Sequence, residues 1–366
     1  MRSLGSAAFP PPAFMSDIAR RKADHLDLAV SGDVAFNQKT TLFECVRLVH
    51  DALPELDFDE VDLSVELLGK KLRAPMLIAA MTGGHPRAER INRELAALAE
   101  ELGLAFGLGS QRAMLRDPTA IASYRVRDLA PTALILGNIG IVQAASMSTR
   151  EVEDLVGAVG ADALCVHLNP AMEVVQPEGD RDFRHGVATL TRLTNELSVP
   201  VIAKETGCGL STLVARRLQA AGVRHVDVSG AGGTSWVAVE TQRATEGKKA
   251  LGQTFWDWGI PTAASVVCVA RVGFETVFAT GGVQGGLDIV KALVLGASAG
   301  GIARPVLQAL ERGGVDGARG FLLQVQAEIR TAMLLTGARN TRALARSPRV
   351  LVGELCQWLE QEALPR

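Results

Sequence analysis

The chain has 366 residues, of which 48% are hydrophobic and only 4% aromatic, so small aliphatic side chains must fill most of its core. This composition is typical of buried parallel sheets that are covered by helices. The 38 basic residues nearly balance the 40 acidic ones without a long basic stripe, which argues against a nucleic-acid partner. No apolar run is long enough to span a bilayer, so we expect no membrane partner. Five scattered cysteines without a CxxC pair fit a reducing cytoplasm, where we expect the protein.

The first 73 residues precede the regular part of the chain, and we expect them to form an N-terminal extension and lead-in. Residues 1–40 are irregular and polar, and Met15 within them is an alternative start. An alternating apolar stretch over residues 61–67 predicts a hairpin.

From residue 74 onward, short apolar runs alternate with amphipathic helical patterns, as in βαβ units. The runs predict eight strands, over residues 76–81, 104–108, 133–138, 163–168, 199–204, 225–229, 276–280 and 299–303. Helices are predicted over residues 87–102, 211–221 and 286–295, and terminal helices over 317–360. Eight such units favour a (β/α)8 TIM barrel over residues 74–366. Residues 230–275 form a long insertion after the sixth strand, which predicts a loop over the active site with its own helix.

A Rossmann-type sheet is the alternative architecture. It needs a GxGxxG turn between an early strand and a helix, and the sequence has no such unit. The sequence also has no Walker A motif and no GxSxG elbow.

Polar residues follow nearly every predicted strand. In chain order they include Thr82, Ser110, Arg112, Asn138, His167, Asn169, Lys204, Thr234, Gln284 and Arg304. One polar residue after a strand usually just forms a turn. In a barrel, however, the carboxyl ends of all the strands converge on the face where active sites are built, so this pattern predicts a site there.

Glycine pairs after the later strands indicate a phosphate site. Gly281 and Gly282 precede the helix predicted to start near Gly286. Barrel phosphate sites commonly lie after strands seven and eight, where free N–H groups at a helix N-terminus attract an anion. Bare glycine loops also occur as ordinary tight turns, so it is the position in the barrel that favours a phosphate.

Lys204 ends a very apolar strand, and a buried lysine is costly unless it is paired or used. It could form a Schiff base or place a positive charge beside the electron-rich edge of a flavin. Alternatively, it forms a purely structural salt bridge with Glu205 or Asp227.

Two further groups could bind an anionic substrate and its metal ion. Glu173 is a lone carboxylate with neutral neighbours, which suits Mg²⁺ shared with substrate phosphates better than zinc. The alternative is a solvated loop glutamate. A basic arm with Arg21, Lys22 and His25, together with Arg112, could neutralise a diphosphate, although a solvated arm is the simpler interpretation.

Taken in order, the motifs resemble those of the type 2 isopentenyl diphosphate isomerases, which are FMN-dependent barrel enzymes. The resemblance runs from about Arg21 to the last barrel helices. It is carried by Arg21-Lys22-x-x-His25, Met81-Thr-Gly-Gly84, Gly107-Leu-Gly-Ser-Gln-Arg112, His167-Leu-Asn-Pro170, Pro177-Glu-Gly-Asp180, Lys204-Glu205, Ser229-Gly-x-Gly-Gly-Thr234 and Trp258-Gly-Ile-Pro-Thr262.

The resemblance implies a function and a set of site residues. In such enzymes NAD(P)H reduces the flavin, which then moves a proton so that isopentenyl diphosphate becomes dimethylallyl diphosphate. The implied FMN contacts are Ala80, Met81, Thr82, Ser110, Asn138, Lys204, Thr234, Gly282, Val283, Gln284, Ala303 and Arg304. The implied contacts of the substrate are Arg21, Lys22, Ser110, Arg112, His167 and Asn169, with Glu173 on Mg²⁺ and Lys204, His167 and Met172 at the catalytic centre. Family members are homo-oligomers, usually tetramers or octamers.

Two positions depart from the family pattern. Met172 stands where the family has a glutamine that assists proton transfer, and a thioether cannot donate or relay a proton. Gln284 stands where the family usually has an arginine beside the flavin phosphate, and an amide lacks that charge. The alternative functions are therefore a divergent FMN enzyme for another prenyl diphosphate or related substrate, and a flavin- or diphosphate-binding protein without turnover.

Overall fold

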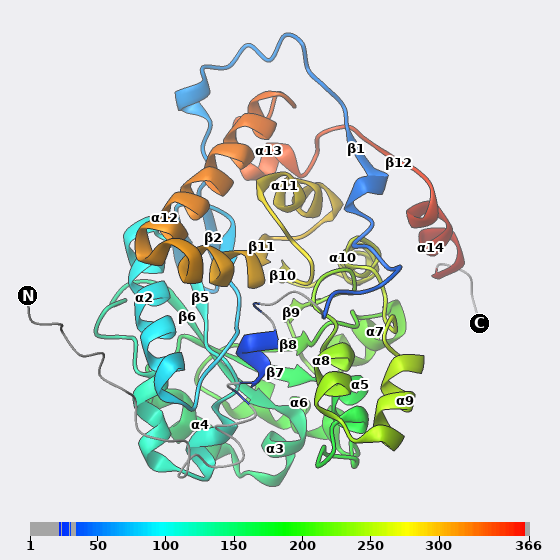
Figure 1. The fold of residues 1–366 in the computed structure, drawn as a ribbon. Helices are drawn as coiled ribbons and strands as arrows, with labels where there is room; N and C mark the ends of the chain where they lie inside the picture. Colours follow the sequence, from blue (N-terminus) through cyan, green and yellow to red (C-terminus); the bar gives the residue numbers. More distant parts are fainter. Residues whose placement is uncertain (1–21, 23, 29, 31–33, 363–366) are drawn as a thin grey trace, which may run out of the picture.

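The computed structural model describes residues 22, 24–28, 30 and 34–362, and the statements below refer to these residues. Its centre is a closed barrel of eight parallel strands in the order β10-β11-β4-β5-β6-β7-β8-β9 (Figure 1). The strands are β4 (Met76–Ile78), β5 (Ala105–Gly107), β6 (Leu134–Gly140), β7 (Ala163–Leu168), β8 (Val201–Glu205), β9 (His225–Asp227), β10 (Thr276–Ala279) and β11 (Ala299–Ile302). The last strand closes onto the first, with Gly300 beside Met76. The predicted (β/α)8 fold is confirmed.

Small and medium apolar side chains fill the inside of the barrel, as the composition predicts. This inner cluster includes Leu77, Ala105, Leu136, Cys165 and Phe278, all buried. A larger cluster lies between the strands and the surrounding helices. Because both faces of every strand are buried, the strands appear in the sequence as short continuous apolar runs.

The helices around the barrel include α2 (Pro86–Leu102), α3 (Ile141–Ser146), α4 (Thr149–Gly157), α5 (Pro170–Val175), α6 (Gly186–Glu196), α7 (Thr212–Ala220), α10 (Thr262–Val272), α11 (Gly286–Leu295) and α12 (Arg304–Leu334). Local signals set their ends. Ser148 and Glu151 form a capping box at the start of α4. Helix α11 ends at Gly296, whose φ of 110° suits glycine. Gly314, with φ 61°, interrupts α12.

The insertion between β9 and β10 contains two helices, α8 (Trp236–Arg243) and α9 (Glu246–Thr254), before the barrel helix α10. The sequence predicted only one extra helix there. In Figure 1, α8 and α9 lie beside α5 at the edge of the barrel. The lead-in segment docks on this insertion, because Ser235 N–H donates to Val34 O (2.8 Å) and Trp256 Nε1 donates to Ala35 O (2.9 Å).

The lead-in also forms two small antiparallel sheets. Strands β2 (Val65–Leu67) and β3 (Lys70–Leu72) form a hairpin around Leu68 and Gly69, both with positive φ, as a type I′ turn requires. A hairpin was predicted here, but over residues 61–67, which contain only its first strand. Strand β1 (Val46–Leu48) pairs with β12 (Arg349–Leu351), which lies between α13 (Thr341–Leu344) and α14 (Glu354–Glu362). We expected only helices in this last region. Short 3-10 helices span Phe43–Cys45, Phe58–Glu60, Gln111–Leu115 and Pro118–Tyr124.

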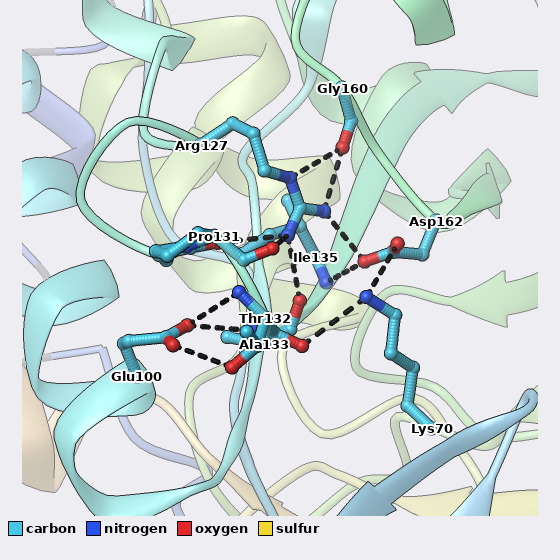
Figure 2. A network of polar contacts seen from close by, with 10 residues as sticks. Lys70, Glu100, Arg127, Pro131, Thr132, Ala133, Ile135, Gly160 and Asp162 are labelled. Carbon is cyan, nitrogen blue, oxygen red and sulfur yellow. Dashed lines mark hydrogen bonds and ion pairs between the residues drawn. The ribbon is translucent and has the colours of Figure 1, made fainter.

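A polar network closes the amino-terminal end of β6 and β7 (Figure 2). Arg127 donates to the carbonyls of Ala133 (2.9 Å) and Gly160 (2.7 Å) and pairs with Asp162 (2.6 Å). Asp162 also accepts the N–H of Ile135 (2.8 Å) and pairs with Lys70 (3.1 Å). The amino-terminal end of a barrel typically contributes to stability, whereas the functional site lies at the carboxyl ends of the strands. In the described part of the chain, no helix is long and apolar enough to cross a membrane.

Candidate active site

A cavity of about 320 Å³ opens at the carboxyl ends of the barrel strands. Every site residue predicted from the sequence lines it, except Arg21, which lies outside the described residues. The predicted residues that line it are Lys22, Ala80, Met81, Thr82, Ser110, Arg112, Asn138, His167, Asn169, Met172, Glu173, Lys204, Thr234, Gly282, Val283, Gln284, Ala303 and Arg304. The structure thus brings together residues that are up to 282 positions apart in the chain, from Lys22 to Arg304.

Lys204 forms a salt bridge with Asp227, one of the two partners that the sequence suggested, and it also lines the cavity. Its Nζ lies 3.1 Å from Asp227 Oδ2, and the two side chains are 11% and 4% exposed. It also donates to the backbone oxygen of Glu205 (2.9 Å). Asp227 is held in turn by the hydroxyl of Thr280 (2.6 Å). The pair therefore fixes an ammonium group at the cavity wall, where it can face an anionic ligand.

Glu205 shapes the loop after β8 rather than the cavity itself. Its buried carboxylate accepts backbone N–H groups from Thr206, Cys208 and Gly209, the last at 3.1 Å. Burial raises the pKa of Glu205 to about 8, against the opposing effect of these hydrogen bonds and of Lys204. The loop that Glu205 holds carries Thr206 and Gly207, which line the cavity. The buried Thr206 hydroxyl has no hydrogen-bond partner among the described residues.

His167 is neutral at physiological pH, and its free nitrogen can be assigned. Burial, together with the positive charges of Lys204, Lys22 and Arg112, lowers the pKa of His167 to about 3. Its Nδ1 lies 2.8 Å from Asn138 Oδ1. Asn138 is oriented by donation from Nδ2 to Leu108 O (3.1 Å), so its Oδ1 must accept a hydrogen bond from Nδ1–H of the histidine. Nε2 is therefore the unprotonated nitrogen, available as an acceptor.

Helix α5 places Met172 and Glu173 at the cavity. Asn169 Nδ2 donates to Glu173 Oε1 (2.9 Å), and the N–H of Asp180 donates to Oε2 (2.8 Å). Gly179 must be glycine here, because an added Cβ would lie 1.9 Å from Glu173 O. Asp180 then pairs with Arg112 (3.2 Å) and accepts from Gln143 (2.7 Å). Among the described residues, no cluster of three His, Cys, Asp or Glu side chains forms a metal site.

Lys22 enters the cavity from the lead-in segment and is held in place there. Its Nζ donates to Ser110 O (2.8 Å) and to the hydroxyl of Tyr124 (2.8 Å). Tyr124 in turn donates to Ser110 O (2.6 Å), and its ring leaves no room for a side chain at Gly83. In the structure, Lys22 is thus a fixed charge of the cavity rather than part of a solvated arm.

The N-termini of two helices near the glycine loops differ in how they are capped. At α11, which the sequence suggested for phosphate binding, Gly286 N–H donates to Glu328 (2.6 Å) and Gln284 N–H donates to Asp288 (3.0 Å). These carboxylates occupy two of the N–H groups that an anion at this helix end would use. At α12, no described side chain caps the N-terminus at Ala303, and Arg304 lines the cavity there. Gly282, Val283 and the start of α12 also line the cavity, where an anion could reach their N–H groups.

Comparisons with known proteins agree with this arrangement. A family model described as FMN-dependent dehydrogenase matches residues 15–122 and 119–350. A lactate oxidase from Pediococcus acidilactici shares the fold, with a TM-score of 0.65 and 15% identity over 92% of this chain and 94% of its own.

Two curated relatives are far more similar in sequence. The isopentenyl-diphosphate delta-isomerase of Methanosarcina mazei is 46% identical over 349 residues, which cover 94% of either protein. The protein of the same name from Halobacterium salinarum is 47% identical over 352 residues, 93% of this chain and 96% of its own. The chain belongs to the type 2 isopentenyl-diphosphate delta-isomerase family. The family resemblance inferred from the motifs is confirmed.

Several groups at the site of this isomerase-family chain were not predicted. Gln143, Gln176, Thr206 and Trp236 also line the cavity. Glu240, fully buried on α8, pairs with His25 Nε2 (2.7 Å) and with Arg243 (2.8 Å). The sequence did contain a signal for this pairing, since Glu240 lies within the apolar pattern of α8 and a buried carboxylate needs partners. Its partner His25 lies more than 200 positions away in the chain, and local patterns do not show such a pairing.

Proposed function

We propose that this protein converts isopentenyl diphosphate to dimethylallyl diphosphate with FMN bound in the cavity. The convergence of Lys22, Arg112, His167 and Lys204 on one cavity carries the proposal. The three positively charged groups suit an anionic substrate beside an anionic cofactor, and the neutral His167 can accept a hydrogen bond from a ligand. Relatives named isopentenyl-diphosphate delta-isomerase at 46–47% identity support the same reaction.

FMN fits the donor set of the cavity. We assign its phosphate to Gly282, Val283 and the uncapped start of α12 at Ala303 and Arg304. Gln284 is exposed at this rim, with its side chain on Gly282 O (3.4 Å), so we expect Arg304 to provide the charge there. The remaining proposed contacts are Ala80, Met81, Thr82, Ser110, Asn138, Lys204 and Thr234, and the unpartnered hydroxyl of Thr206 adds one more. When bound and reduced by NAD(P)H, FMN supplies an acid–base centre for the isomerisation.

The chain's own residues orient the substrate and hold protons. Lys22 and Arg112 bind the diphosphate, with Arg21 joining them from outside the described residues. His167 offers its unprotonated Nε2 as an acceptor, and Asn138 keeps the ring in that tautomer (2.8 Å). Asn169 orients Glu173, which shares Mg²⁺ with the diphosphate.

Met172 supports a second candidate function, a divergent FMN enzyme that acts on another prenyl diphosphate. Its sulfur lies 3.9 Å from Asn169 Nδ2, in the cavity wall beside the proposed metal ligand. A side chain that cannot relay a proton at this place slows or changes the reaction.

A substrate panel separates the candidates. The FMN-loaded protein is reduced under anaerobic conditions and given isopentenyl diphosphate and several allylic and homoallylic diphosphates, each with and without Mg²⁺. Interconversion of the two C5 diphosphates supports the isomerase, whereas turnover of another diphosphate alone supports the divergent enzyme. Bound flavin without any product supports a binding protein without turnover. Assembly into tetramers or octamers stays a prediction.

A further inference from the structure

Gln176 has a buried side-chain amide that the proposed roles do not use. The residue is only 2% exposed. Neither its Nε2 nor its Oε1 has a hydrogen-bond partner among the described residues. A buried amide without partners is destabilising, because it loses its hydrogen bonds to water and gains none in return. Such a group in a native protein indicates a partner that binds from outside the chain.

The position of Gln176 connects it with the cavity. It follows α5 directly, three residues after Glu173 and four after Met172, and its N–H closes the last turn of the helix on Met172 O. All three also line the cavity. The loop that begins with Gln176 ends at Asp180, which pairs with Arg112 (3.2 Å). Gln176 thus lies in the chain between Glu173, the proposed metal ligand, and Asp180, which contacts Arg112 of the proposed diphosphate site.

The backbone of Gln176 is firmly anchored, so its side chain is directed by the fold. Its N–H donates to Met172 O (3.0 Å), and its carbonyl accepts from Gly179 N–H (3.2 Å). Lys248 from α9 also donates to this carbonyl and to Pro177 O (3.0 Å).

Other glutamines near the site show what a structural amide looks like in this protein. Gln111, which is fully buried, donates to Leu155 O (3.0 Å) and accepts from Asn138 N–H (2.9 Å). Gln143 donates to Asp180 (2.7 Å). Gln176 differs from both, because its backbone is fixed while its amide is unsatisfied.

We propose that the amide of Gln176 binds the substrate diphosphate, either at a phosphate oxygen or at a water of its Mg²⁺. The NH₂ group can donate to phosphate oxygens, and the carbonyl oxygen can accept from metal-bound water. A neutral amide provides these bonds without adding a charge to a wall that already holds Glu173 and Asp180. The identity of this ligand rests on the proposed function.

The test compares Gln176→Leu and Gln176→Met with the matched variant Gln111→Leu. Thermal unfolding without substrate is measured first, on the FMN-loaded full chain. We expect both Gln176 variants to unfold at the parent midpoint or above it, because they remove an unpaired amide. Gln111→Leu should unfold at a lower midpoint, because it leaves two partners unsatisfied.

Binding of inorganic diphosphate is then measured by calorimetry, with and without Mg²⁺. A lost hydrogen bond to a charged group should raise the Kd of the Gln176 variants by about 10–100-fold. A loss seen in both conditions indicates a phosphate oxygen, and a loss seen only with Mg²⁺ indicates a metal-bound water. Gln176 variants that unfold early, fail to fold or bind diphosphate like the parent would overturn the proposal. If the parent itself binds no diphosphate, the substrate class in the proposed function is rejected as well.

Discussion

Replacing Asp227 with asparagine would leave the ammonium group of Lys204 buried without its carboxylate. The two groups are 3.1 Å apart, and their side chains are 11% and 4% exposed, so the pair is largely shielded from water. Asparagine keeps an oxygen for the donors on Asp227 Oδ1, Thr280 Oγ1 (2.6 Å) and Ser229 N–H (3.2 Å). The substitution therefore keeps these two hydrogen bonds, removes the negative charge and sets an amide NH₂ donor against the ammonium group.

Removing one partner of a buried ion pair typically costs about 3–5 kcal/mol. Unfolding entropy is about 2.1 cal/mol/K per residue, so for 366 residues it reaches about 0.8 kcal/mol/K. The midpoint of unfolding should then fall by about 4–6 °C. A bound anion that pairs with Lys204 would reduce this difference.

Differential scanning calorimetry of the parent and Asp227→Asn, at one pH and one scan rate, measures this shift. Glu275→Gln is the matched control, since Glu275 forms an exposed pair with Arg224 (3.3 Å) and such pairs contribute about 0–1 kcal/mol. An Asp227→Asn midpoint within the range of that control would refute the reasoning that the buried pair of Lys204 and Asp227 stabilises the fold.

Four further outcomes are expected. Met172→Gln should raise isomerase turnover by at least about 10²-fold in a product assay, because it adds a group able to relay a proton. The pKa of Glu205 is raised from 4.5 to about 8, so its contribution to stability is complete below pH 4.5 and is lost as the pH rises through 8. Glu205→Gln should remove this loss, which is measured as the change of the unfolding midpoint with pH. The negative charge of bound diphosphate should raise the pKa of His167 from about 3, so binding should be accompanied by proton uptake that grows toward acidic pH. Titration calorimetry in buffers of different ionisation enthalpy measures this uptake. Arg127→Met should lower the unfolding midpoint but leave the Kd of FMN unchanged in fluorescence titration.

Opposite results have clear meanings. Unchanged turnover in Met172→Gln means that position 172 does not limit proton transfer. A Glu205→Gln curve parallel to the parent means that another group titrates in that range. Proton uptake that persists in His167→Asn removes the histidine from the diphosphate site, and weaker FMN binding in Arg127→Met means that the two ends of the barrel are coupled.

The barrel was predictable because each strand is marked locally. Buried on both faces, strands such as β7 and β8 appear as short apolar runs, and the residues after them were found from position alone. The predicted helix over 286–295 matches α11. Local patterns also predicted that Lys204, His167 and Glu173 would share one face, because barrel topology brings all strand ends together.

The remaining features depend on contacts between distant segments. Strand β12 has three residues and exists through its pairing with β1, about 300 positions earlier, so nothing local marks it as a strand. The same holds for the pair of His25 and Glu240, and for the carboxylate of Glu328 that covers the start of α11. The phosphate site suggested at Gly286 stays a prediction, and its proposed assignment to α12 rests on those carboxylate contacts. The division of the chain at residue 73 stays a prediction.

Isomerisation in deuterated water tests the central claim most directly. The FMN-loaded protein is reduced anaerobically and incubated with Mg²⁺ and isopentenyl diphosphate, and product and flavin are followed by NMR and by visible absorption. Proton transfer at this cavity without net redox predicts dimethylallyl diphosphate that carries solvent deuterium, while the flavin stays reduced through many turnovers. An unchanged substrate beside bound, reduced flavin, or flavin that is oxidised in proportion to the product, would contradict the account.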